Sequence, residues 1–207
     1  EIGQNLSDEQ ELTHLLNTIA KKAKELLAVE ISWVYLHDPK RDDLQMAAIE
    51  GQVNGYEETV GTRMDIGNGV VGRVAQHREM LIIEDYRVWE KHQPNYVQAN
   101  FTSVLSVPML YSGELVGVLI VSDVAPKVRD FTQDEIEILS LFATSAAGAV
   151  HSARLFNKTQ QRLNQLQSLR NIDKAISGVL ERDLMLRILL GQIVKQLEVD
   201  ASSVLLY

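Results

Sequence analysis

The sequence predicts an α+β fold in which antiparallel strands are preceded by one helix and followed by a long connector helix. Three observations carry this prediction. Apolar residues recur at three- and four-residue steps near the N-terminus. The segment "SVLSVPMLYSGELVGVLIVSD" has the pattern of a hairpin, with two apolar runs around a glycine-containing turn. Finally, about 46 residues, from 132 to 177, contain no proline and a single glycine, Gly148.

The first helix is expected to begin at a capping box formed by Ser7 and Gln10. Its apolar stripe consists of Leu12, Leu15, Leu16, Ile19, Ala20, Ala23, Leu26 and Leu27. A β-branched and aromatic strand follows at about 29–37, and both of its alternating sets are apolar, so we expect both faces of the sheet to be covered. After a charged turn, "LQMAAIEG" is the returning strand.

The hairpin strands are expected at 103–110 and 115–122, and Thr132 and Glu135 form a second capping box before the long helix. At 1.5 Å per residue this helix would be roughly 70 Å long, which is more than a small domain can cover, so it is expected to project. The alternative is a helix that lies along its own domain. No uninterrupted apolar run approaches the roughly 18 residues needed to cross a bilayer.

The segment "DIGNGVVGRVAQHREMLIIEDY" raises a separate question, because Gly67, Gly69 and Gly72 match the dinucleotide-binding pattern. The residues before Gly67 are too polar for a buried parallel strand. Only a short segment separates Gly72 from Met80, whereas a crossover needs at least about 10 to 12 residues. We therefore expect a loop with tight turns that opens a short helix from Val70 to about His77.

Taken in order, "IGNGVVGRVAQHREMLIIED", the hairpin and "FTQDEIEILSLFATSAAGAV" resemble a GAF domain over about residues 8–155. The resemblance implies a six-stranded antiparallel sheet with a helix bundle on one face and a ligand pocket on the other. It also implies a small-molecule sensor in a bacterial signalling protein. The cyclic-nucleotide branch of the family carries Asn-Lys after the last strand, where this chain has Ser122-Asp123, so a cyclic nucleotide is not the expected ligand.

Composition excludes several kinds of site. The chain has no cysteine, which excludes disulfides, a thiol nucleophile, the thioether-linked bilin of one family branch and the cysteine chemistry of sulfoxide-reducing relatives. A net charge of −8 disfavours nucleic acid and anionic membranes as partners. Haem and metal are not expected, because the histidines are scattered without ligand spacing: His14, His37, His77, His92 and His151. No nucleophile motif is present, so we expect no enzyme activity and no cofactor.

Aromatic and polar residues gather in the stretch 84–106, a composition that suits a pocket for a small organic molecule. The candidate pocket residues are Trp33, Tyr35, Asp85, Tyr86, Trp89, His92, Tyr96, Phe101, Ser103 and Ser106. The alternative is that the aromatic rings only fill the interior and that Asp85 caps a short helix.

An internal repeat determines the predicted organisation. Residues 29–36, "VEISWVYL", match residues 199–206, "VDASSVLL", and without a gap Leu16 and Leu27 fall on Leu186 and Leu197. We therefore expect a GAF-like sensor domain over 1–155, a helical connector over 156–182 that continues the helix from about 132, and the start of a second, truncated GAF-like domain over 183–207.

The connector carries apolar residues near three-four spacing, with Asp173 as a polar interruption, as in a short coiled-coil seam. These residues are Leu155, Leu163, Leu166, Leu169, Ile176 and Leu180. They favour a homodimer whose helices pass a change in packing to a covalently linked effector domain of a cytoplasmic signalling protein, such as a two-component system. Two alternatives remain: a GAF domain without ligand that serves as a dimerisation spacer, and a nucleotide-dependent oxidoreductase fragment.

Overall fold

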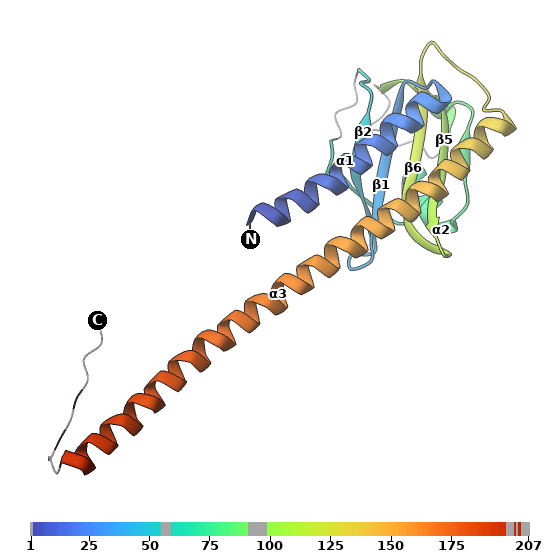
Figure 1. Cartoon of the computed structure of the whole chain (residues 1–207). Coiled ribbons are helices and arrows are strands. Elements are labelled where there is room, and N and C mark those ends of the chain that lie inside the picture. Colours follow the sequence, from blue (N-terminus) through green and yellow to red (C-terminus); the bar gives the residue numbers. More distant parts are fainter. Residues whose placement is uncertain (1, 55–58, 91–98, 198–200, 202, 204–207) are drawn as a thin grey trace. The chain divides into compact units, whose positions relative to one another are not determined.

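The computed structural model describes the backbone of residues 2–54, 59–90, 99–197, 201 and 203, and their side chains except at 2–9, 175–183 and 195–197. Its described strands form one antiparallel sheet in the order β3-β2-β1-β6-β5-β4 (Figure 1). The strands are β1 (Ile31–Asp38), β2 (Asp43–Glu50), β3 (Arg63–Asp65), β4 (Leu81–Ile83), β5 (Phe101–Tyr111) and β6 (Glu114–Val124). The helices are α1 (Ile2–Leu27), α2 (Gly69–His77), the 3-10 turn η1 (Tyr86–Val88) and α3 (Gln133–Leu197). The predicted six-stranded antiparallel fold is confirmed.

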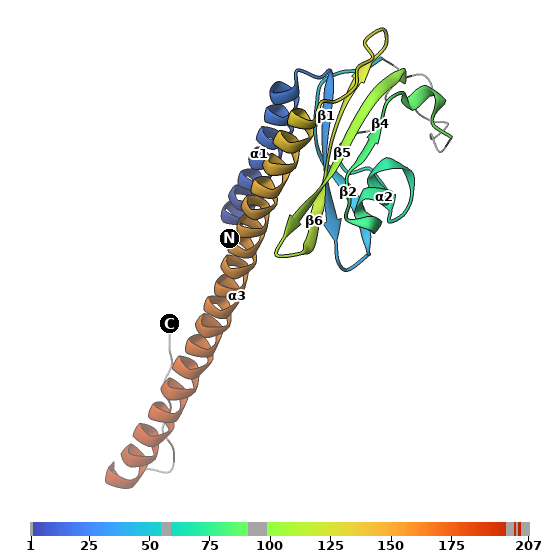
Figure 2. The ribbon, with the colours of Figure 1, turned by 90° about the vertical axis from the view of Figure 1, so that its right-hand side faces the viewer.

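Both faces of the sheet are covered, as the two apolar sets of β1 predict. Val34 and Leu36 belong to the core beneath α1 and α3, whereas Trp33 and Tyr35 belong to a second core beneath α2. Figure 2 shows α1 and the first part of α3 side by side on one face of the sheet, with α2 on the other. The sheet therefore separates a helix-packed core from the core that contains the candidate site.

The core beneath α1 is built from the predicted stripe except Leu26, which is 49% exposed. Leu16, Ile19, Ala20 and Ala23 are all buried, and full burial of a large apolar side chain contributes about 1.5–3 kcal/mol. The buried Ser32 hydroxyl donates to the Ala20 carbonyl at 2.6 Å, which joins β1 to α1. The expected start at Ser7 is wrong, because α1 already begins at Ile2.

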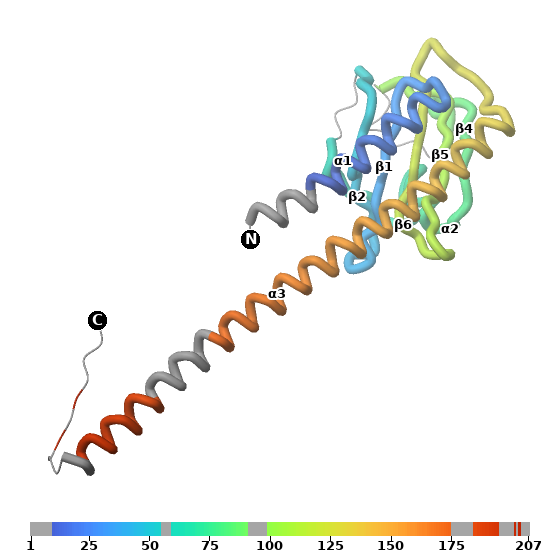
Figure 3. The backbone as a smooth tube through the Cα atoms, in the orientation of Figure 1, coloured from blue at the N-terminus to red at the C-terminus, as the bar shows by residue number. Residues whose placement is uncertain are grey.

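The start of α3 follows the predicted capping box. The Thr132 backbone N–H donates to Glu135 Oε2 at 2.8 Å, and the Glu135 N–H donates to the Thr132 hydroxyl at 3.3 Å. The helix α3 ends at Leu197, beyond the stretch 132–177 on which its expected length was based. Figure 3 traces the described stretches of α3 in colour.

The chain divides into two units, residues 1–157 and 158–207. In the first unit, Leu139, Ala143 and Ala147 of α3 are fully buried against the sheet. Among the described residues, the segment Gln133–Lys174 is long and apolar enough to cross a membrane by length and composition alone, with a mean hydropathy of 1.2 in its most apolar window. Burial in the domain core accounts for part of that apolar character, since the same residues pack on the sheet.

The glycine pattern forms a tight loop before α2. The Gly67 N–H donates to the Gly72 carbonyl at 2.8 Å, and Gly67 and Gly69 have positive φ angles of 86° and 60°. A Cβ on Gly72 would lie 2.3 Å from the Asp65 carbonyl oxygen, so only glycine fits there. Antiparallel strands flank this loop, so it is not a dinucleotide-binding turn; the predicted loop and short helix are confirmed.

An ion cluster, which we call the Arg63 cluster, ties the edge strand β3 to the β1–β2 hairpin. Arg63 Nε lies 2.6 Å from Asp43 Oδ2, and its Nη2 lies 3.0 Å from Asp38 Oδ2. Hydrogen bonds from the Lys40 backbone N–H and from Arg63 lower the pKa of Asp38, and the hydrogen bonds from Arg63 lower the pKa of Asp43. The cluster fixes β3 where Met64 reaches the second core.

Candidate functional site

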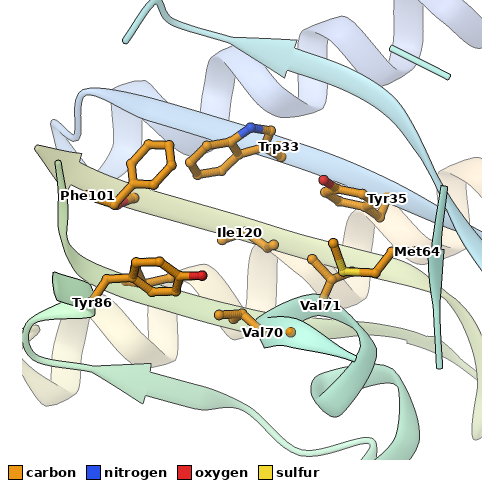
Figure 4. Close-up of a pocket in the computed structure, with 11 residues that line it drawn as sticks. Trp33, Tyr35, Met64, Val70, Val71, Tyr86, Phe101 and Ile120 are labelled. Atoms are coloured by element: carbon orange, nitrogen blue, oxygen red, sulfur yellow. The ribbon is translucent and has the colours of Figure 1, made fainter. Parts of the chain in front are cut away.

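A cavity of about 50 Å³, partly open to solvent, lies between the sheet and α2 (Figure 4). A cavity of that size holds roughly a few water molecules. Its walls come from β1, β3, α2, η1, β5 and β6, and its lining residues are Trp33, Tyr35, Met64, Gly69, Val70, Val71, Tyr86, Phe101, Val104, Ile120 and Ser122.

The alternation of side chains along the strands determines which residues form the floor of the cavity. Trp33 and Tyr35 are two residues apart on β1 and therefore share a face, and Trp33 pairs in register with Ile120 on β6. A register shift in β5 between Phe101 and Val104 brings both of these residues to the same face. The floor thus comes from three adjacent strands of the sheet.

The aromatic rings of the lining meet edge to face. The Trp33 and Phe101 ring centroids lie 5.4 Å apart at an interplanar angle of 79°, and the Tyr86 and Phe101 centroids lie 6.3 Å apart at 81°. This is the arrangement that the ring quadrupoles favour, and it fixes the positions of the rings. On the other side of the cavity, the short helix α2 contributes Val70 and Val71, which the glycine loop positions.

The polar side-chain groups of the described lining residues are the Tyr and Ser hydroxyls and the indole N–H of Trp33. The hydroxyl ends of Tyr35 and Tyr86 point inward in Figure 4. The Ser122 hydroxyl donates to the Asp123 carbonyl at 2.8 Å. Within the part of the chain that the structure describes, no charged side chain lines the cavity, and no three His, Asp or Glu residues gather as metal ligands. Such a lining can bind an uncharged molecule, but those described residues include no acid–base pair.

Four of the predicted pocket residues line this cavity: Trp33, Tyr35, Tyr86 and Phe101. Trp89 does not line it and instead packs on Tyr86, with ring centroids 5.6 Å apart. His92 and Tyr96 lie outside the described residues.

Asp85 does not enter the cavity, because it caps η1 as the alternative reading proposed. Its carboxylate accepts from the Arg87 backbone N–H at 3.0 Å and from Arg87 Nε at 2.8 Å. Hydrogen bonds from the Arg87 side chain lower the pKa of Asp85.

The two predicted serines of β5 also lie outside the lining. The register shift turns Ser103 away, so its hydroxyl donates to the Glu84 carbonyl at 3.3 Å and accepts from the Arg129 backbone N–H at 2.8 Å. Ser106 is fully buried and pairs with Ile120 and Leu81 on the neighbouring strands. Among the described residues its Oγ has no hydrogen-bond partner.

The aliphatic half of the lining was not predicted, although strand alternation provides a signal for part of it. Ile120 and Ser122 alternate on β6, and Ile120 pairs with the predicted floor residue Trp33. The contributions of Met64 and of α2 depend on how the glycine loop folds back over the sheet, and no local pattern encodes that packing.

Beyond the cavity, β6 continues into a buried ion cluster, which we call the Arg129 cluster. The fully buried Asp123 carboxylate lies 2.8 Å from Lys127 Nζ and 2.8 Å from Arg129 Nε. Arg129 also donates to Glu135 at 3.0 Å and to the Leu27 carbonyl at 2.6 Å. Burial by itself raises the pKa of Glu135, but hydrogen bonds from Thr132 and the charges of Arg129 and Lys127 outweigh burial and lower this pKa. The cluster joins β6 to the end of α1 and the start of α3.

The predicted seam residues of the connector carry exposed side chains. The exposed fractions are 57% for Leu155, 47% for Leu163, 63% for Leu166 and 59% for Leu169. The side chains of Ile176 and Leu180 lie outside the described residues.

Comparison with known proteins agrees with this architecture. The family model of the GAF domain matches residues 9–151. No curated protein matches the chain. The fold is similar to the GAF domain of an Acinetobacter phosphoenolpyruvate-protein phosphotransferase, at 23% identity and a TM-score of 0.59, over 74% of this chain and 94% of that one.

Two further solved structures share the fold. The blue-light absorbing form of the Thermosynechococcus elongatus PixJ GAF domain is 19% identical, with a TM-score of 0.60 over 77% of this chain and 96% of that one. A free methionine-R-sulfoxide reductase from Neisseria meningitidis, solved with its substrate, is 20% identical, with a TM-score of 0.56 over 73% of this chain and 88% of that one. The same fold therefore occurs in a light-absorbing protein and in an enzyme.

Proposed function

Because the chain belongs to the GAF domain family, a sensor and regulatory fold of signalling proteins, we propose that it is a non-catalytic small-molecule sensor. The observation that carries the proposal is the aromatic cavity between the sheet and α2, which joins apolar walls to a few polar groups as ligand sites do. The cysteine-free sequence supports the non-catalytic part, since no thiol is present for sulfoxide reduction. No cofactor is part of this proposal.

The output of the sensor is α3. Ile120 and Ser122 of β6 line the cavity, and the next residue, Asp123, belongs to the Arg129 cluster at the start of α3. A ligand that shifts β6 would therefore act on a buried ion cluster that contacts both helices of the domain. The ligand can bias the two states only by its difference in affinity for them.

A homodimer through the connector completes the signalling proposal. Four leucines of the predicted seam are exposed on α3, and pairing with a second copy would bury them. We expect such a pair to pass the signal to a covalently linked effector in a cytoplasmic, bacterial protein. Nucleic acid and membrane are not among the proposed partners, in keeping with the net charge of −8.

We also propose a tandem arrangement, in which residues 183–207 form the start of a second GAF-like domain. The internal repeat aligns Leu27, the last residue of α1, with Leu197, the last residue of α3. Residues aligned with the buried face of α1 are also apolar: Leu186, Leu189, Leu190 and Ile193.

A ligand screen with two readouts tests the function. Thermal unfolding of residues 1–207 against a metabolite library should reveal compounds that raise the melting temperature, because binding to the folded state must stabilise it. Sedimentation of the same protein should give a dimer. A dimer without any stabilising compound would favour the second candidate, a ligand-free dimerisation spacer. The oxidoreductase alternative is not retained, because the glycine loop lies between antiparallel strands.

A further inference from the structure

We propose that the cavity binds an uncharged single aromatic ring that carries one hydrogen-bonding group, as in a phenol. This inference rests on the sensor function proposed above and names its ligand class. Four aromatic side chains surround the cavity, and the centroids of three of them lie within 5.4 to 6.3 Å of a neighbour. A planar ring can add to such an edge-to-face set without disturbing the existing pairs.

The described lining residues carry no charge, and we therefore expect the ligand to be uncharged as well. Burying a carboxylate or phosphate costs several kcal/mol unless a cation or several donors compensate for it. The two cations that follow β6, Lys127 and Arg129, are already paired with Asp123 in the Arg129 cluster. A neutral ring therefore fits this lining, whereas its carboxylate analogue does not.

Ser106 supplies the reason for a hydrogen-bonding group. It lies two residues from Val104 on the same face of β5, and it pairs with the lining residue Ile120. The side chain is fully buried, and its Oγ has no partner among the described residues. An unsatisfied buried hydroxyl is destabilising, so a ligand hydroxyl that reaches it gains a bond that the free protein lacks.

The cavity is too small for an aromatic ring unless α2 moves away from the sheet. A dry cavity of about 150 Å³ binds benzene in another protein, about three times the volume present here. A ring therefore enters only if the cavity widens. α2 packs over β5 and β6, is nine residues long and is joined to β3 by the glycine loop, so it is the element that moves. Its displacement uncovers the β5 face that carries Ser106.

A single-tryptophan protein makes the cavity observable. The chain has two tryptophans, and Trp89 does not line the cavity, so Trp89→Phe leaves Trp33 as its fluorescent reporter. Phenol, toluene, benzoate and cyclic GMP are titrated into W89F protein of the full 207 residues at neutral pH, with melting temperature as the second readout. We expect phenol to change Trp33 emission and raise the melting temperature, toluene to bind more weakly, and benzoate and cyclic GMP to have no effect.

Ser106→Ala tests the hydrogen bond. We expect it to weaken phenol binding about fivefold and to change toluene binding less than twofold, because only phenol loses a partner. The matched control is Ser103→Ala, which removes a hydroxyl that bonds Glu84 and Arg129 instead. It should lower the melting temperature and leave the preference for phenol over toluene unchanged.

The outcomes separate the ligand class from the sensor function. Equal loss of phenol and toluene binding in Ser106→Ala overturns the assigned hydrogen bond. Binding of benzoate or cyclic GMP that changes Trp33 emission overturns the uncharged class and leaves a sensor with another ligand. If none of the four probes changes Trp33 emission at millimolar concentration, the ring class is wrong, and the library screen alone then decides whether the domain is a sensor.

Discussion

Replacing Arg129 by methionine should destabilise the sensor domain by about 3 kcal/mol, because it leaves the Asp123 carboxylate without its principal partner. Asp123 is fully buried, and the Arg129 side chain is 24% exposed, so solvent replaces little of the lost interaction. Lys127 remains 2.8 Å from the carboxylate, but it is 41% exposed, which keeps the expected loss at the lower end of the range for a broken buried pair.

The assay is urea unfolding of Trp89→Phe protein followed by Trp33 fluorescence, which reports on the domain that contains the cluster. The exposed pair Arg87–Asp85, with side chains 43% and 23% exposed, provides the control, and Arg87→Met should cost about 0–1 kcal/mol. The double variant Asp123→Asn with Arg129→Met should be less destabilised than the sum of the single variants, since no unpaired buried charge remains. A loss below about 1 kcal/mol for Arg129→Met, or full additivity, would refute the reasoning.

Four further variants test other parts of the structure. Gly148→Ala should stabilise α3 by about 0.5–1 kcal/mol in thermal unfolding, because a Cβ there meets only ordinary contacts. Gly117→Ala should instead prevent stable folding, because its Cβ would lie 2.1 Å from the Tyr35 carbonyl oxygen of β1. The Arg63 cluster lowers the pKa of Asp38 and Asp43, so its stabilisation is present above their unfolded pKa near 3.9 and is lost as pH falls below it. Arg63→Gln should therefore reduce the fall of the melting temperature with decreasing pH in this range. An unchanged dependence of the melting temperature on pH would contradict the assignment. Leu166→Glu with Leu169→Glu should convert the dimer to monomer in sedimentation without lowering the melting temperature of the domain, since both side chains are exposed; a dimer that persists would argue against the seam.

The sequence was most informative where a local pattern has one physical solution. The Thr132–Glu135 capping box, the glycine loop and the β5–β6 hairpin formed as predicted, because each depends on residues close in the chain. The ends of helices were less predictable. A capping pattern at Ser7 does not stop α1 from beginning at Ile2, because adjacent residues can also adopt helix.

The cavity was predicted in part, for a reason that lies in β5. Composition singled out the aromatic residues, but it does not determine which face of a strand a residue occupies. The register shift between Phe101 and Val104 turns Ser103 toward Arg129 and leaves Phe101 in the lining. A one-residue change of this kind reverses alternation, and nothing in the local sequence signals it.

Methionine methyl NMR tests the central claim most directly, because four of the five methionines lie in the sensor domain and Met185 lies outside it. Met64 lines the cavity, Met109 is buried beneath the helices on the other face, and Met80 is 49% exposed. A compound that stabilises the protein should shift the Met64 methyl signal and leave that of Met80 in place. Stabilising compounds that shift the Met80 or Met185 signal while Met64 stays unchanged would contradict a ligand site between the sheet and α2.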